Sequence, residues 1–156
     1  MRELIDTYYA YQQWANRRIL ETAATVPFEQ LTVPVLSRFD PVRSTLTHMM
    51  WAQQLWLRRF MGKPETPHLE PEAYPDLDAL RARWDAIDAE TNDFLASLTG
   101  ERLAAGLPGR DIPLWRAMLH QANHQTYHRG EVAAVLTHLG ASPGELDLNR
   151  MYDGRR

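Results

Sequence analysis

Four stretches of the chain show core-type residues recurring every three or four positions, the spacing that places them on one face of an α-helix. A regular pattern of this kind covers residues 77–98, and a similar stripe crosses residues 2–24. Two further helices are predicted at residues 41–61 and 113–139. The 77–98 stripe consists of Leu77, Leu80, Trp84, Ile87, Thr91, Phe94 and Leu98.

Glycine and proline mark the expected ends of these helices. Asp40 is expected to cap the second helix, because its carboxylate can accept from free backbone N–H groups, and Pro41 suits the first helical position. Gly62, Gly100 and Gly140 are expected to end the second, third and fourth helices. The second helix is apolar on more than one face, which indicates that several neighbours pack against it.

The segments between the helices are long for a minimal bundle. Residues 63–78 carry four prolines and are predicted to form an ordered loop. Residues 100–113 are predicted to be a loop with a short extended piece, and residues 142–156 a tail laid over the helices. With no strong strand pattern, the chain is predicted to be all-α: a four-helix bundle with longer inter-helix loops, in a single domain of residues 1–156.

Composition narrows the function classes. The chain has no uncharged apolar run near the roughly 20 residues that a membrane span needs. Its N-terminus lacks the features of a signal peptide, so a cytoplasmic location is expected. The net charge of −3 and the scattered arginines give no basic patch, which argues against nucleic-acid binding. There is no cysteine, so a thiol would have to come from outside the protein.

Three of the six histidines lie in one stretch, LHQANHQTYHRGEV, at His120, His124 and His128. Residues four apart on a helix differ by about 40° in direction and about 6 Å along the axis. On this geometry His124 and His128 fall in the stripe that faces the core, whereas His120 lies at its edge. The outer two histidines are about 12 Å apart along the axis, too far to share one ion easily. The predicted ligand pair is therefore His124 and His128.

A third ligand should come from another helix, and His48 is the best candidate because it lies in the middle of the second helix on a mostly small or apolar face. His68 fits less well because it lies in the proline-rich loop, and His138 is explained by the helix dipole. Spacing alone leaves two alternatives open: a metal site, or core histidines held by hydrogen bonds.

The sequence resembles the DinB/YfiT-like family over nearly its whole length. The resemblance rests on YYAYQQWANRRIL, on STLTHMMWAQQLWLRRFMG and above all on the H-x-x-x-H-R-G-E motif that runs into L-x-x-L-G-x-x-P. It implies a four-helix bundle with a divalent metal held by His48, His124 and His128. It also implies use of a low-molecular-weight thiol such as bacillithiol or mycothiol, and homodimerisation. Trp14 and Trp115 are candidates for an interface, and equally for the core.

Three histidines leave a coordination position open, which is typical of catalytic rather than structural zinc sites. The ligand set suits zinc or nickel best, with iron, manganese and copper also compatible. The leading hypothesis is a metal-dependent transferase acting on a small molecule with an external thiol. The alternatives are a hydrolase that uses metal-activated water, and a bundle that binds metal without catalysis or uses the histidines structurally.

Two neighbours of the histidines bear on these hypotheses. Gln125 stands where the metalloprotease motif H-E-x-x-H has its catalytic glutamate, which argues against a protease. Glu131 is expected either to orient a ligand imidazole or handle protons, or to pair with Arg129 or another arginine at the surface. Tyr127 is expected at the rim of the site or in packing.

Overall fold

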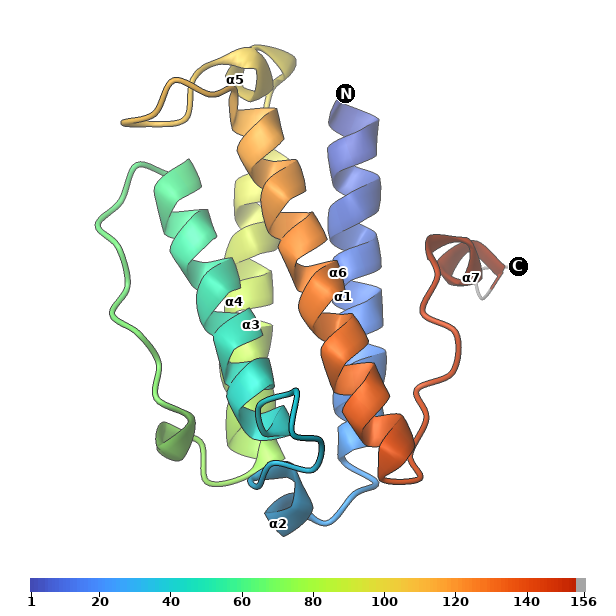
Figure 1. Cartoon of the computed structure of the whole chain (residues 1–156). Coiled ribbons are helices and arrows are strands. Elements are labelled where there is room, and N and C mark those ends of the chain that lie inside the picture. Colours follow the sequence, from blue (N-terminus) through green and yellow to red (C-terminus); the bar gives the residue numbers. More distant parts are fainter. Residues whose placement is uncertain (154–156) are drawn as a thin grey trace.

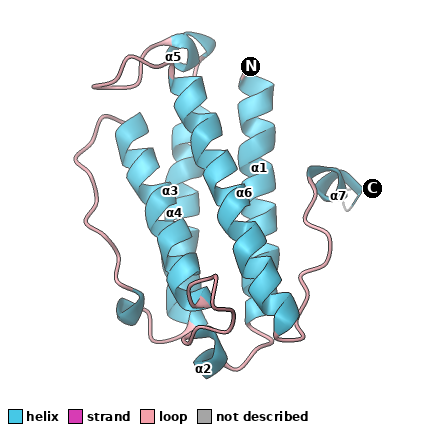
Figure 2. Ribbon diagram, viewed as in Figure 1, coloured by secondary structure: helices cyan, strands magenta, loops and turns pink. Residues whose placement is uncertain are grey.

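The computed structural model describes residues 1–153 and shows four long helices side by side (Figures 1 and 2). These are α1 (Arg2–Ala23), α3 (Val42–Phe60), α4 (Leu77–Ser97) and α6 (Leu114–His138). The short helices are α2 (Phe28–Leu31), the 3₁₀ turn η1 (Pro71–Ala73), α5 (Gly100–Ala104) and α7 (Leu148–Asp153). Residues 1–153 contain no strand, only an isolated bridge between Gly106 and Pro113. The predicted all-α bundle is confirmed.

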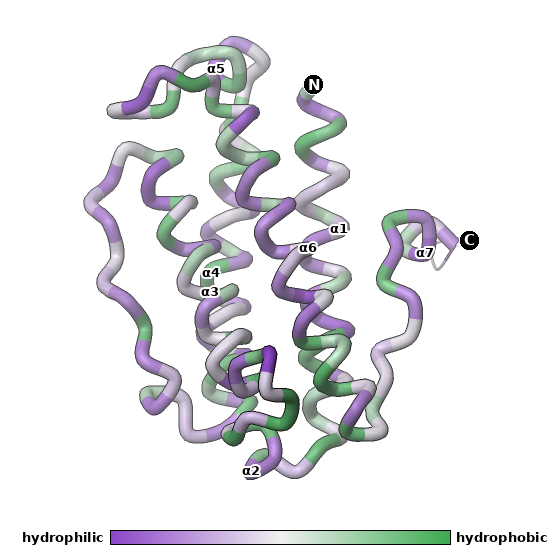
Figure 3. Tube along the Cα trace, viewed as in Figure 1, coloured by the Kyte–Doolittle hydropathy of each residue, from purple (hydrophilic) through white to green (hydrophobic). Residues whose placement is uncertain are grey.

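The long connection at residues 61–76 determines the topology. In Figure 1, α1 and α6 run in one direction and α3 and α4 in the other, so the chain must cross the full length of the bundle between α3 and α4. Hydrophilic positions dominate this crossing segment (Figure 3), and it lies on the outside of the bundle. Helix α6 packs against both α1 and α3, while α4 contacts α3 and α1 and closes the ring. The functional histidines lie at the α3–α6 contact.

Apolar side chains fill the two ends of the bundle. One cluster contains Leu46, Trp84 and Val135, and the other contains Ile5, Phe60 and Leu114. All six are at most 2% exposed. Burying one such side chain contributes about 1.5–3 kcal/mol. The helices are therefore held at both ends, which fixes the relative positions of α3 and α6 between them.

A polar network lies between the helices at mid-height. The side-chain amide of Gln53 on α3 donates through Nε2 to Oδ1 of Asp88 on α4, at 2.6 Å. Its Oε1 accepts from Nε1 of Trp84 at 2.9 Å and from Nε2 of Gln12 on α1 at 3.2 Å. Because buried polar groups need partners, this network favours one register of α1, α3 and α4.

Three local predictions are wrong. Pro41, not Asp40, occupies the N-cap of α3, and no side chain caps that end. Pro41 is not the first helical residue, because its extended backbone (ψ 142°) keeps it outside the helix. Gly100 does not end α4, which stops at Ser97. It begins α5, where the Thr99 hydroxyl accepts from the backbone N–H of Arg102 at 3.1 Å.

The C-terminal tail lies over the bundle as predicted, with one addition. The hydroxyl of Tyr11 on α1 donates to the carbonyl of Leu146 at 2.7 Å. The tail also forms α7, which the sequence reading missed, and buries Met151. The last part of the predicted tail, 154–156, lies outside the described residues. No helix within 1–153 is both long and apolar enough to cross a membrane.

Candidate metal centre

The structure brings together the three histidines expected to bind a metal. His48 projects from the middle of α3, and His124 and His128 project from consecutive turns of α6. One potential ligand atom from each lies within 4.8 Å of the other two. Within residues 1–153, no other group of three or more histidine, aspartate or glutamate side chains comes this close together in a metal-binding arrangement.

The distances fit one shared ion. Nε2 of His48 lies 3.2 Å from Nε2 of His124. Two nitrogen atoms bound at about 2.0–2.1 Å to one tetrahedral ion lie roughly 3.3 Å apart. The His128 ring centroid is 4.8 Å from that of His48 and 4.5 Å from that of His124. The three imidazoles therefore have the spacing of a three-histidine metal site.

The electrostatics favour neutral imidazoles, the form that coordinates a metal. Burial, followed by repulsion from His128 and His48, lowers the pKa of His124 to about 4. Burial and the neighbouring His128 and His68 also lower the pKa of His48. Both rings are thus uncharged at neutral pH, with nitrogen lone pairs available to an ion.

Glu131 contacts one of the three candidate ligands. Its Oε2 lies 2.6 Å from Nδ1 of His128, and both side chains are about four-fifths buried. This contact places the proton on Nδ1 and leaves Nε2 of His128 free for a metal, the carboxylate–histidine arrangement common in metal sites. The alternative was a pairing of Glu131 with Arg129 or another arginine at the surface, and no such pair is found within residues 1–153. Glu131 contacts His128, and the buried Arg129 donates to Asn16 and Thr126.

His120 lies outside the group, as the helical geometry predicted. It is exposed, and its ring stacks 6.3 Å from that of His124 and 5.1 Å from that of Trp56. Tyr127 is 64% exposed at the rim, with its ring 5.1 Å from that of His128. Neither side chain belongs to the set that could hold the ion.

Gln125 points away from the site. It is fully buried, and its Nε2 donates to the backbone carbonyl of Met49 at 2.6 Å, while its Oε1 accepts from Asn16 at 3.4 Å. These bonds join α6 to α3 and α1. Gln125 is thus structural. The position at which the H-E-x-x-H motif has its catalytic glutamate faces the bundle interior in this protein.

A cavity of about 440 Å³ opens beside the histidines. His48, His128 and Glu131 line one side of it. The other walls come from three chain segments: Arg38, Phe39 and Asp40 before α3, His68 and Pro71 in the crossing connection, and Tyr127 on α6. A volume of this order holds a small organic molecule next to the open side of the histidine group.

Arg38 and Asp40 were not predicted to line a cavity, and His68 was considered a poor candidate for the third metal ligand. Asp40 was expected to cap a helix, but no side chain caps the start of α3, and Asp40 lines the cavity. The residues precede α3 by only a few positions, so the available signal was their nearness in sequence to the helix that carries His48.

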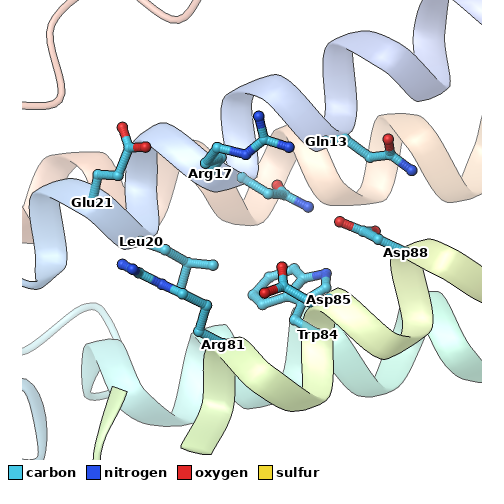
Figure 4. A pocket seen from close by; sticks show the side chains of 9 residues that line it. Gln13, Arg17, Leu20, Glu21, Arg81, Trp84, Asp85 and Asp88 are labelled. Atoms are coloured by element: carbon cyan, nitrogen blue, oxygen red, sulfur yellow. The ribbon is translucent and has the colours of Figure 1, made fainter. Parts of the chain in front are cut away.

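A second, smaller cavity of about 160 Å³ lies between α1 and α4 (Figure 4). Gln13 and Arg17 of α1 face Asp85 and Asp88 of α4 across it (Figure 4). Burial and the neighbouring Asp85 raise the pKa of Asp88 to about 6, against the lowering effect of its bond to Gln53 and of Arg17. No histidine lines this second cavity, so it offers no imidazole to a metal ion. The cavity beside the three histidines is therefore the better candidate for a metal site.

Two comparisons with known proteins bear on the family of the chain. Protein DinB of Bacillus subtilis (strain 168) is 23% identical over 164 residues, which cover 94% of this chain and 92% of that protein. The family model described as DinB family matches residues 1–155. The chain therefore belongs to the DinB family.

Proposed function

We propose that the protein binds a divalent metal ion through His48, His124 and His128 and uses it to transfer a low-molecular-weight thiol to an electrophilic small molecule. The observation that supports this proposal is the position of His48 and His128, two of the three grouped histidines, on the wall of a cavity of about 440 Å³. A purely structural metal site would be closed by a fourth protein ligand, and within residues 1–153 no fourth histidine, aspartate or glutamate joins this group.

The donor set favours zinc or nickel, and three imidazoles also suit iron or manganese. A divalent ion held there supplies Lewis acidity, which lowers the pKa of a small thiol so that it is ionised at neutral pH. Glu131 keeps the His128 ring in one orientation and one tautomer. The protein part of the site is thus arranged before any small molecule enters.

The proposed reaction forms one bond and breaks one. The thiol gives up its proton to solvent, its sulfur attacks an electrophilic carbon of the substrate, and the leaving group departs with the bonding electrons. Since the chain has no cysteine, the sulfur nucleophile must come from the second substrate. Phe39, Pro71 and Tyr127 give the cavity an apolar part, against which the carbon skeletons of the two molecules would pack.

Hydrolysis with metal-activated water is the alternative. Water bound to a divalent ion can ionise near neutral pH without a protein base, as a bound thiol can. Glu131 contacts His128, and Gln125 faces the interior, so Asp40 is the remaining acidic residue on the cavity wall. The two reactions are therefore separated by whether a thiol binds at the site, which the experiment below measures.

The test uses protein loaded with cobalt(II), whose visible spectrum reports its ligands. Addition of 2-mercaptoethanol or cysteine should produce a sulfur-to-cobalt charge-transfer band and a new d–d spectrum in the wild-type protein, and neither in His128→Ala. If azide changes the spectrum but no thiol does, the thiol proposal is wrong. Turnover of an activated ester without any thiol, lost in His124→Ala, would support the hydrolase instead.

A further inference from the structure

The crossing connection forms a wall of the cavity and is bound along α3 at several points. The guanidinium of Arg58 donates to the carbonyl of Pro64 at 2.9 Å, and Arg59 pairs with Glu65 at 2.7 Å. Near the start of α3, Arg43 pairs with Glu72 at 2.8 Å. These contacts join the two ends of residues 64–72 to the helix that carries His48, so the segment between them has a defined position.

Trp51 holds the middle of this connection next to the histidine group. Its indole Nε1 donates to the carbonyl of Thr66 at 3.4 Å, and its ring centroid is 4.6 Å from that of His68. On its other side the same indole lies 5.8 Å from the ring of His48. Trp51 therefore places a fourth imidazole, that of His68, beside the candidate metal centre.

His68 is in the cavity but outside the ligand group. It lines the same cavity as His48 and His128, and it is not among the side chains close enough to share an ion. Its side chain is 53% exposed, so its ring remains accessible to a small molecule. Nδ1 of His68 faces Oε1 of Glu70 at 3.7 Å. This separation is longer than a hydrogen bond, so Glu70 does not hold a proton on Nδ1, and either ring nitrogen can carry the N–H.

We propose that His68 makes a direct hydrogen bond to the small anion or thiolate that enters the cavity beside the histidine group. The inference rests on the proposed metal site and adds a residue that contacts the ligand without binding the metal. The imidazole is suited to this, because a neutral ring carries one N–H, which can donate to an anion in the cavity that His68 lines. The Trp51 ring packs against this imidazole, and the bonds from Arg58 and Arg59 hold the segment that carries it.

Azide is the probe, measured as an absorption titration of the cobalt(II)-loaded protein. His68→Ala should keep its cobalt and bind azide about 3- to 10-fold more weakly, the effect of losing one hydrogen bond. His68→Gln should recover most of the affinity, because its side-chain amide can donate in place of the imidazole. His138→Ala is the matched control: it removes a histidine at the end of α6, outside the cavity, and should bind azide like the wild type.

Each outcome decides a separate point. Unchanged azide affinity in a fully loaded His68→Ala protein overturns the inference and leaves the metal site intact. Equal weakening in His68→Ala and His68→Gln also overturns it, because the ring would then act by packing on Trp51. A wild-type protein that takes up no cobalt overturns the proposed metal site itself, and the role of His68 with it.

Discussion

Nδ1 of His128 lies 2.6 Å from Oε2 of Glu131, three residues further along α6. The two side chains share one face of one helix, so this contact needs no other element to form it. Its consequence reaches across to α3, because it turns the remaining nitrogen of His128 toward the space shared with His48 and His124. A local contact on α6 thereby prepares a site that belongs to two helices.

Removing Glu131 should weaken metal binding without abolishing it. In Glu131→Ala the His128 ring loses the partner that fixes its orientation and tautomer, and changes of this kind typically cost 10- to 100-fold in metal affinity. Zinc affinity is measured by competition with a coloured chelator. Glu101→Ala on α5, remote from the site, serves as the control. An unchanged zinc affinity in Glu131→Ala would show that the carboxylate does not support the site.

Gln125→Glu should destabilise the fold rather than create a protease-like site. The glutamate would have no N–H to donate to the Met49 carbonyl and would place a charge in a fully buried position. An unpaired buried polar group costs about 1–3 kcal/mol, and a charge costs more. Thermal unfolding of the metal-free protein should therefore show a clear drop in Tm.

Gln30→Glu is the control for that experiment, because the same chemical change falls on an exposed side chain and should leave Tm nearly unchanged. A Gln125→Glu protein with wild-type Tm and new metal-dependent peptidase activity would contradict the structural role assigned to Gln125.

Asp88 should make the stability depend on pH. Because burial raises its pKa to about 6 from 3.8, the folded state holds this proton more tightly than the unfolded state. The associated stability is present at low pH and is lost as pH rises through about 6. Asp88→Asn keeps an oxygen that can accept from Gln53 and removes the charge. At pH 7.5 it should raise the free energy of unfolding by about 1–3 kcal/mol, allowing for partial exposure.

The same comparison at pH 4 should show little difference, because Asp88 is then protonated in the folded protein. Urea unfolding of both proteins at the two pH values gives the four free energies needed, and the shared contributions of all other groups cancel. A stabilisation that is equal at pH 4 and pH 7.5 would rule out titration of Asp88 as its cause.

Features that repeat along one helix could be predicted from the sequence. The period of about 3.6 residues placed α1, α3, α4 and α6 within a few residues of their ends, and it separated His124 and His128 from His120. The helix positions of the remaining histidines made His48 the best third candidate, and the family resemblance then implied it. No local pattern can pair a residue of α3 with two residues of α6 that lie more than seventy positions away.

Features that depend on contacts between distant segments could not be predicted from the sequence. Asp40 is a residue type that often caps helices. The extended backbone of Pro41 makes α3 begin at Val42, and Asp40 lies on the cavity wall instead. His68 was set aside as a loop residue, because only the folded chain shows Trp51 holding it beside His48. The short α7 has too few residues for a periodic pattern and forms over α1.

The metal content of the purified protein tests the central claim most directly. Wild type, His48→Ala, His124→Ala, His128→Ala and His120→Ala are loaded with zinc, dialysed and measured by elemental analysis, with circular dichroism to confirm folding. We expect about one ion per chain in wild type and His120→Ala, and loss of most of it in the other three variants. Full metal content in folded His48→Ala and His128→Ala would contradict the three-histidine site.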